Sequence, residues 1–352
     1  MPPRLTRQAL HELRLAIQRN CHISDARYAG EYSLCTYLLK MREYYRWEKG
    51  FASTAKLQNG EVGDWVHHRE RMWAELEDDS FEPIKVCGHR FDPFDDDGIN
   101  HELLPQGLVY SGGYGRFGKP HFFLARVLRV EPCGHHRVII SGEEYARDLS
   151  APPAMTRGKT IFVRRQSLRT MIWERVEEWR WKRRDNAMAR AMAYYDIDLD
   201  PERALDQITD NELETAIMHE LGERIAGELL GTAWEELLLD VVRTPAEVTA
   251  RAIRDQLADC LSTLPALLAL ENLPAVHFYF ASLNGLRKQL SPGLTQAYQH
   301  LVESGDLSEL KRSIAPGRRQ SLSVARDLLE LHRRHGDACA PHVAALTDPG
   351  RF

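Results

Sequence analysis

The chain has 352 residues, of which 43% are hydrophobic and 28% are charged, a globular composition that excludes a disordered or collagen-like protein. Its 46 basic and 51 acidic side chains give a net charge of −5, which excludes a global positive field that would attract nucleic acid. Six cysteines are too few for a disulfide framework. The most apolar window, which begins at Thr263, is too short for a membrane span. We therefore expect a cytoplasmic protein that does not enter the membrane.

The first part of the chain, residues 1–80, is predicted to be helical. After Asp25, apolar and aromatic residues recur at helical spacing as far as Gly50, and a second helix is expected from Gly63. Residues 81–166 form a β-rich region, because short β-type runs alternate there with prolines and glycines. These runs predict a small antiparallel sheet in the middle of the chain.

Residues 167–336 return to helical periodicity and are expected to form a C-terminal helical body. Thr244, which precedes a proline, and Ser321 are predicted helix starts. Residues 337–352 are expected to be a loosely ordered tail. This order of elements predicts a predominantly α-helical α+β fold, in which both ends of the chain build a helical body around the small antiparallel β-sheet region.

Three segments resemble those of an uncharacterised bacterial protein family of unknown function. They are EYSLCTYLLKMREYYRWEKG at residues 31–50, GLVYSGGYGRFGKPHFFLARV at residues 107–127, and ARDLSAPPAM at residues 146–155. The resemblance covers most of the chain. It implies no activity, ligand or catalytic residue.

A metal site is indicated by His219 and Glu223, whose spacing of four residues places both side chains on one face of a predicted helix. The segment is similar to the H-E-x-x-H motif of zinc peptidases, with Glu223 at the position of the second histidine. Asp255 and Asp259 share a face of another predicted helix. Helical bundles that direct imidazoles and carboxylates inward build di-iron and related sites. We therefore hypothesise a zinc or iron site at these four residues, with further candidate ligands at Glu31, Glu212 and His277.

The helix predicted around His219 also includes Gly222, Gly227 and Gly231. Glycine weakens a helix by about 1 kcal/mol relative to alanine, a cost that is tolerated where a neighbouring helix packs closely. We therefore expect His219 to meet Asp255 or Asp259 across a helix–helix contact. The alternative is that these carboxylates remain solvated or pair with nearby arginines.

A second zinc hypothesis involves Cys87, His89, Cys133 and His135, which form two Cys-Gly-His units in the β-rich region. Thiolate and imidazole groups from two strand edges are typical zinc ligands. The spacing differs from the usual C-x2-C, and the alternative is that each cysteine is a small buried side chain next to a turn.

An anion site is suggested by the segment from Gly113 to Lys119, which has the G-x-x-x-x-G-K spacing of a phosphate-binding loop. Pro120 stands where that loop needs a hydroxyl group, and a β-type run follows instead of a helix. A nucleotide-binding loop is therefore not expected, but Arg116 and Lys119 remain candidates for holding an anion.

Three functions remain open from the sequence. The first is a metal-dependent enzyme with its centre at His219 and Glu223. The second is a non-catalytic scaffold or regulatory module that docks a protein partner or a second copy of the chain. The third is RNA or phosphate binding by the basic residues 157–190, although the acidic residues 196–240 are an alternative partner for that segment.

Overall fold

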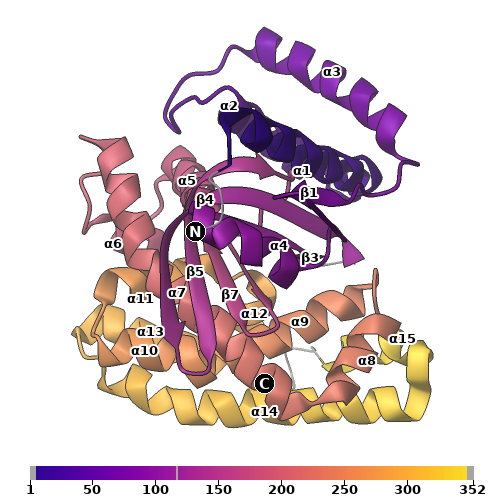
Figure 1. Ribbon diagram of the computed structural model, residues 1–352. Coiled ribbons are helices and arrows are strands. Elements are labelled where there is room, and N and C mark those ends of the chain that lie inside the picture. The colour runs from indigo at the N-terminus through magenta and orange to yellow at the C-terminus, as the bar shows by residue number, and fades with distance from the viewer. Residues whose placement is uncertain (1–4, 116–117, 347–352) are drawn as a thin grey trace. The chain divides into compact units, whose positions relative to one another are not determined.

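The computed structural model describes residues 5–115 and 118–346, which fold into two compact units (Figure 1). The first unit contains residues 1–174 and 200–209, and the second contains residues 175–199 and 210–352. Each unit has its own buried apolar clusters.

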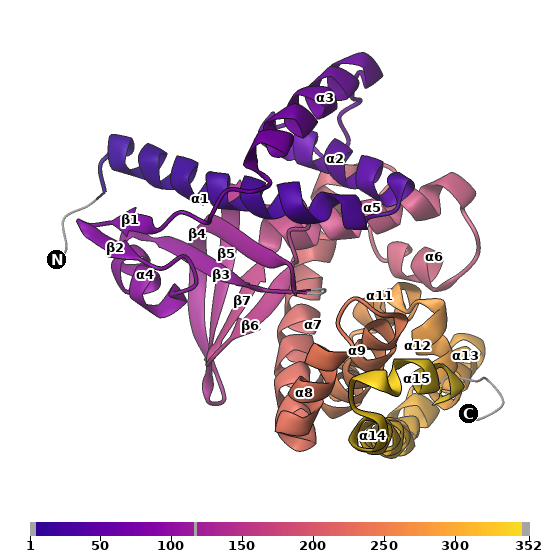
Figure 2. The ribbon, with the colours of Figure 1, turned by 90° about the vertical axis from the view of Figure 1, so that its right-hand side faces the viewer.

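The first unit begins with helices α1 (Arg7–Tyr28), α2 (Leu34–Glu48) and α3 (Asn59–Leu76), and a 3-10 turn, η1 (Ala29–Glu31), follows α1. The hydroxyl groups of Thr6 and Ser33 accept hydrogen bonds from main-chain amides and so cap α1 and α2. Figure 2 shows α1 crossing the main sheet. Leu13, Ile17 and Cys21 bury one face of α1 against apolar strand residues.

The strands of the first unit are β1 (Ile84–Val86), β2 (His89–Phe91), β3 (Leu108–Tyr114), β4 (Pro120–Cys133), β5 (His136–Arg147), β6 (Ala154–Arg157) and β7 (Thr160–Arg164). Strands β1 and β2 form a separate antiparallel hairpin. Helix α4 (Asp96–Leu103) and the 3-10 turn η2 (Leu104–Gln106) then lead into a five-stranded sheet with the order β3-β4-β5-β7-β6.

The prediction of a small antiparallel sheet is wrong in two respects. The sheet has five strands, and β4 and β5 are 14 and 12 residues long. In addition, β5 pairs with β7 in parallel, with Val138 opposite Ile161. The chain reverses direction before and after β6, and β7 then inserts between β6 and β5. Two reversals leave β7 running in the same direction as β5, which local sequence patterns do not reveal.

Two helices have one end in each unit, namely α5 (Arg165–Lys182) and α7 (Pro201–Leu230). The remaining helices of the second unit are α6 (Ala187–Met192), α8 (Thr232–Asp240), α9 (Pro245–Ala258), α10 (Leu264–Ala269), α11 (Leu273–Ser282), α12 (Gly285–Leu290), α13 (Pro292–Ser304), α14 (Ser308–His335) and α15 (Ala340–Leu346). A five-residue π-helix, η4 (Asp259–Thr263), joins α9 to α10. The predominantly helical α+β class is therefore confirmed.

Helix α9 starts after Thr244 as predicted, whereas the predicted start at Ser321 is wrong, because Ser321 lies inside α14. Leu310 and Leu328 are both buried, so one apolar face continues along α14 through Pro316. In the segment expected to be a loose tail, the 3-10 turn η5 (Gly336–Cys339) leads into α15. Among the described residues, no helix combines the length and the apolar character that crossing a membrane requires.

Candidate metal site

Helices α7 and α9 approach closely in the second unit because of Gly222. A Cβ atom at this position would lie 2.4 Å from the main-chain oxygen of Ala258. No side chain larger than hydrogen fits at that distance without moving the backbone. The close approach places His219, one turn before Gly222, beside Asp259 at the end of α9, the meeting expected from the sequence.

His219 uses both ring nitrogens. Its Nδ1 atom lies 2.7 Å from Oδ1 of Asp259, and its Nε2 atom lies 3.4 Å from Oε1 of Glu223. The side chain of His219 is 30% exposed and that of Glu223 is 25% exposed, whereas that of Asp259 is 1% exposed. The imidazole therefore connects a buried carboxylate to a carboxylate that reaches solvent.

Asp259 is held by several donors besides His219. The hydroxyl group of Thr263 donates to its Oδ1 atom over 3.0 Å, and that of Tyr279 donates to its Oδ2 atom over 2.9 Å. Arg287 forms an ion pair with the same Oδ2 atom. These donors fix the carboxylate, so it can orient the His219 ring.

Asp255 completes the group one turn before Asp259. One ligand atom from each of His219, Glu223 and Asp255 lies within 4.8 Å of the others. Arg254 binds the far side of Glu223, with its Nη2 atom 2.7 Å from Oε2. We call His219, Glu223, Asp255 and Asp259 the His219 site.

Burial and the neighbouring charged groups shift the pKa values of the residues in the His219 site. Burial lowers the pKa of His219, but Asp259 and Glu223 favour the imidazolium more strongly and bring its pKa well above the usual range. Burial raises the pKa of Asp259, but Arg287 and His219 outweigh this effect and hold it at about 2. Arg254 likewise keeps the pKa of Glu223 below its ordinary value despite burial. Burial and the neighbouring Glu223 raise the pKa of Asp255 to about 6.

His219, Glu223 and Asp255 thus bring three potential metal-ligand atoms close together. A carboxylate that holds Nδ1 of a histidine leaves Nε2 directed at a metal ion, and imidazole plus carboxylates suit zinc or iron. Asp259 occupies the orienting position, so it is better placed to hold His219 than to contact a metal. The sequence interpretation missed Thr263, Tyr279 and Arg287. Only Thr263, four residues after Asp259, carried a local signal.

The additional candidate ligands Glu212, His277 and Glu31 are not members of the group with metal-ligand spacing among the described residues. Glu212 is buried on α7 two turns before His219, and burial raises its pKa to about 8. His277 is buried on α11, where its Nδ1 atom lies 2.9 Å from the hydroxyl group of Tyr298. Glu31 is exposed in η1 of the first unit.

The second zinc hypothesis gains no support from the geometry. Cys87 and His89 belong to the β1–β2 hairpin, whereas Cys133 and His135 lie at the turn between β4 and β5. Among the described residues, these side chains do not form a group of three with metal-ligand spacing. The side chain of His89 is 66% exposed and lies 3.6 Å from Glu102.

The glycine-rich segment connects two antiparallel strands, because Tyr114 of β3 pairs with Pro120 of β4. A phosphate-binding loop leads instead into a helix. Packing explains one of its glycines, since a Cβ atom at Gly115 would lie 2.4 Å from Nε2 of His121. Of the two candidate anion-binding residues, Arg116 lies outside the described residues.

Lys119, the other candidate, is buried in an ion pair, with its Nζ atom 2.7 Å from Oδ1 of Asp25. Burial lowers the pKa of Lys119, but Asp25 more than compensates and raises it above the ordinary range. Asp25 also accepts hydrogen bonds from the main-chain amide of Leu149. The positive charge of Lys119 is therefore already balanced inside the first unit.

A second buried carboxylate lies beside this pair. Asp148 accepts hydrogen bonds from the main-chain amides of Ser150 and Ala151 at 2.8 and 3.0 Å. The Nδ1 atom of His121 lies 3.2 Å from the same Oδ1 atom. We call Asp25, Lys119, His121 and Asp148 the Asp25 network.

The basic residues 157–190 mostly contact carboxylates. Arg169 lies 3.0 Å from Asp206, and Arg183 lies 2.7 Å from Asp198. Both aspartates belong to the acidic segment 196–240. These contacts favour the interpretation of two oppositely charged helical segments over that of a strip open to RNA phosphates.

Comparison with protein families assigns both parts of the chain. The N-terminal domain of a family of unknown function (DUF6866) matches residues 12–164, and its C-terminal domain matches residues 169–350. The chain has no match among curated proteins or among solved structures. The resemblance to an uncharacterised family is thus confirmed. The chain belongs to the DUF6866 family of unknown function and contains both of its domains.

Proposed function

We propose that the protein is a metal-dependent enzyme whose second unit holds a divalent zinc or iron ion at His219, Glu223 and Asp255. The observation that carries the proposal is the fixed contact between Asp259 and Nδ1 of His219. It leaves Nε2 facing Glu223, and imidazole nitrogen and carboxylate oxygen are ligand types that zinc and iron accept.

Several residues of the protein would hold and orient the proposed metal ligands. Asp259 orients His219, Arg287 and Tyr279 fix Asp259, and Arg254 holds the outer oxygen of Glu223. A bound metal ion would supply Lewis-acid polarisation of a substrate oxygen. The partial exposure of His219 and Glu223 supports access for a substrate.

Metal analysis tests this proposal directly. Wild-type protein is stripped with a chelator, reloaded with Zn²⁺ or Fe²⁺, and analysed by inductively coupled plasma mass spectrometry after desalting. We expect about one metal ion per chain in the wild type and a loss of this metal in His219→Ala and Glu223→Gln, which remove ligands. Glu228→Gln is the matched control, because Glu228 lies on the same helix and pairs with Arg224 at the surface.

A non-catalytic scaffold is the second candidate, and the two arginine pairs favour it. Arg254 with Glu223 and Arg287 with Asp259 already neutralise two carboxylates without a metal ion. In that case His219 is a protonated member of an ion-pair network that holds α7 against α9. Equal, substoichiometric metal in the wild type and in His219→Ala would rule out the enzyme proposal and leave the scaffold.

A further inference from the structure

A pocket of about 450 Å³ opens in the first unit between the end of α1, the turn η1, the start of α2 and the last turns of α3. Its lining consists of small, aromatic and acidic residues: Ala26, Ala29, Gly30, Tyr32, Leu34, Tyr37, Glu70, Trp73, Ala74 and Glu77. The volume lies within the range of small-molecule sites, which is about 300–1,000 Å³. The pocket belongs to neither the His219 site nor the Asp25 network.

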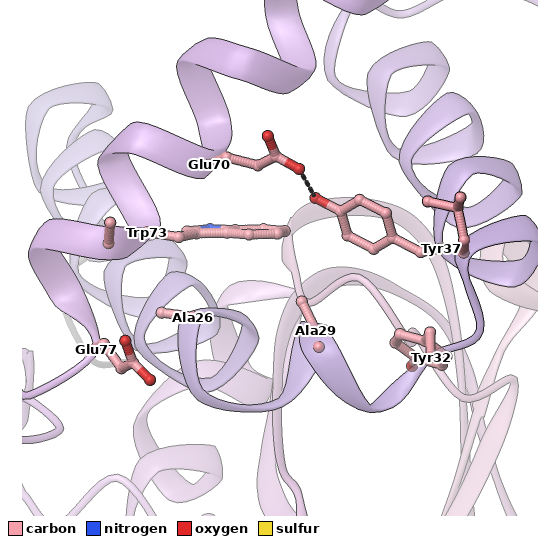
Figure 3. A pocket seen from close by; sticks show the side chains of 10 residues that line it. Ala26, Ala29, Tyr32, Tyr37, Glu70, Trp73 and Glu77 are labelled. Carbon is pink, nitrogen blue, oxygen red and sulfur yellow. Dashed lines mark hydrogen bonds between the residues drawn. The ribbon is translucent and has the colours of Figure 1, made fainter.

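Aromatic rings form part of the walls, and their polar atoms already have hydrogen-bond partners within the protein. Figure 3 shows Trp73 and Tyr37 pointing toward one another across the pocket. The Nε1 atom of Trp73 donates to His22 over 3.3 Å, and the Tyr37 hydroxyl group donates to Oε1 of Glu70 over 3.0 Å. The Tyr32 hydroxyl group is hydrogen-bonded to Ser150. The rings are thus fixed, and what they offer a ligand is apolar surface and π-electron density.

The charge of the lining is purely negative. It contains the two carboxylates of Glu70 and Glu77, and none of its ten residues is Lys, Arg or His. Oε1 of Glu70 accepts from Tyr37, whereas the side chain of Glu77 has no ion-pair partner among the described residues. Arg27, which follows the lining residue Ala26 in the chain, donates to the main-chain oxygens of Glu77 and Asp79 rather than to a carboxylate of the lining.

We propose that this pocket binds an organic ammonium cation with an apolar body. Aromatic faces attract such cations through the ring quadrupole, and carboxylates at the opening add Coulomb attraction. Alanine and glycine at positions 26, 29, 30 and 74 leave room for methyl or methylene groups. Leu34, which is 72% exposed at the rim, offers an apolar surface for the rest of the ligand. An anionic ligand would face two carboxylates without any compensating cation in the lining.

An organic ammonium cation of this kind can be a free small molecule or a methylated lysine side chain of a protein. Isothermal titration of the full chain with choline tests the first, and a trimethyllysine peptide with apolar flanking residues tests the second. The control ligand is 3,3-dimethylbutan-1-ol, which has the shape of choline without its charge. We expect at least one cationic probe to bind at millimolar concentration or below, and the neutral analogue to bind at least about tenfold more weakly than choline wherever choline binds.

Glu70→Gln tests the role of the pocket. Glutamine keeps an oxygen for the Tyr37 hydroxyl group but removes the charge, so the cationic probe should bind about fivefold more weakly. Glu75→Gln, on the same helix but outside the lining, should bind like the wild type. Thermal unfolding checks that both variants are folded. The proposal is overturned if neither cationic probe binds, if choline and its neutral analogue bind equally, or if the two variants show the same affinity.

Discussion

Each unit of this protein contains a histidine whose Nδ1 atom lies against a buried aspartate. In the first unit the pair is His121 with Asp148, and in the second it is His219 with Asp259. Both aspartates are almost completely buried, and in both the aspartate pKa lies below its ordinary value although burial opposes ionisation. The same two residue types therefore occur in similar electrostatic settings.

The surroundings of the two pairs differ. Main-chain amides of Ser150 and Ala151 donate to Asp148, so its carboxylate fixes the chain after β5. In the described part of the chain, the groups that hold the Asp259 carboxylate are all side chains, and Nε2 of His219 faces Glu223. The side chain of His121 is 8% exposed, against 30% for His219. A His–Asp pair thus fixes the backbone where main-chain amides donate to the carboxylate, and its histidine is more accessible to a ligand where side chains hold the carboxylate.

The largest effect is expected from Lys119→Met, which removes one partner of the buried ion pair in the Asp25 network. Asp25 would remain buried without its cation, and breaking such a pair costs about 3–5 kcal/mol. Urea unfolding followed by tryptophan fluorescence measures the loss. A loss below about 1 kcal/mol would show that the pair is not a structural element of the first unit.

The second prediction concerns how burial of Glu212 makes the stability of the fold depend on pH. Because its folded pKa of about 8 lies above the ordinary value of 4.5, its contribution to stability is complete below pH 4.5 and is lost as the pH rises to about 8. Glu212→Gln removes this dependence. Within that window, the free energy of unfolding of the variant should therefore rise relative to that of the wild type by about 1.4 kcal/mol per pH unit. The prediction is contradicted if urea unfolding gives the same difference in free energy between variant and wild type at pH 5 and at pH 8.

The variants Asp259→Asn and Asp148→Asn compare the two His–Asp pairs directly. If the His219 site holds a metal ion, Asp259→Asn should lower metal affinity about 10- to 100-fold, because the carboxylate orients the ligating histidine. Asp148→Asn should destabilise the first unit but leave metal affinity unchanged. Competition with a chelator measures both affinities. Equal effects of the two variants on metal affinity would remove the distinction between the pairs.

The smallest effects concern the glycines of α7. Gly222→Ala places a methyl group against the main chain of Ala258 and should cost about 1–3 kcal/mol. Gly227→Ala meets nothing within 4 Å and should instead stabilise the helix by about 0.5–1 kcal/mol. Thermal unfolding of the two variants checks the opposite signs. A stabilised Gly222→Ala would mean that close helix contact does not build the His219 site.

Part of the site could be predicted because it depends on helical spacing. His219 and Glu223 share a face through their separation of four residues, and the glycines of the predicted helix, Gly222 among them, indicated a close neighbour. The partners of Asp259 could not be inferred in the same way. Tyr279 and Arg287 come from separate helices, 20 and 28 residues further along the chain, and no periodicity links them to Asp259.

The fold shows the same division. Alternating composition located the β-rich region, but it could not order the strands, since β5 could pair with β6 or β7 on pattern alone. The spacing of the glycine-rich segment before Lys119 suggested an anion site. In the structure, Lys119 is buried against Asp25, which is 94 residues away in the chain. Only the packing of α1 on the sheet brings those two charges together.

By itself, the sequence determined the helical and strand regions, the start of α9 at Thr244, and the shared face of His219 and Glu223. These features follow from dihedral preferences and from repeats of a few residues within one element. The tertiary structure decided the parallel pairing of β5 with β7, the Asp25 network and the donors around Asp259. Those contacts join groups far apart in the chain, and they exist because burying whole apolar faces brings the attached polar groups together and leaves them to satisfy one another.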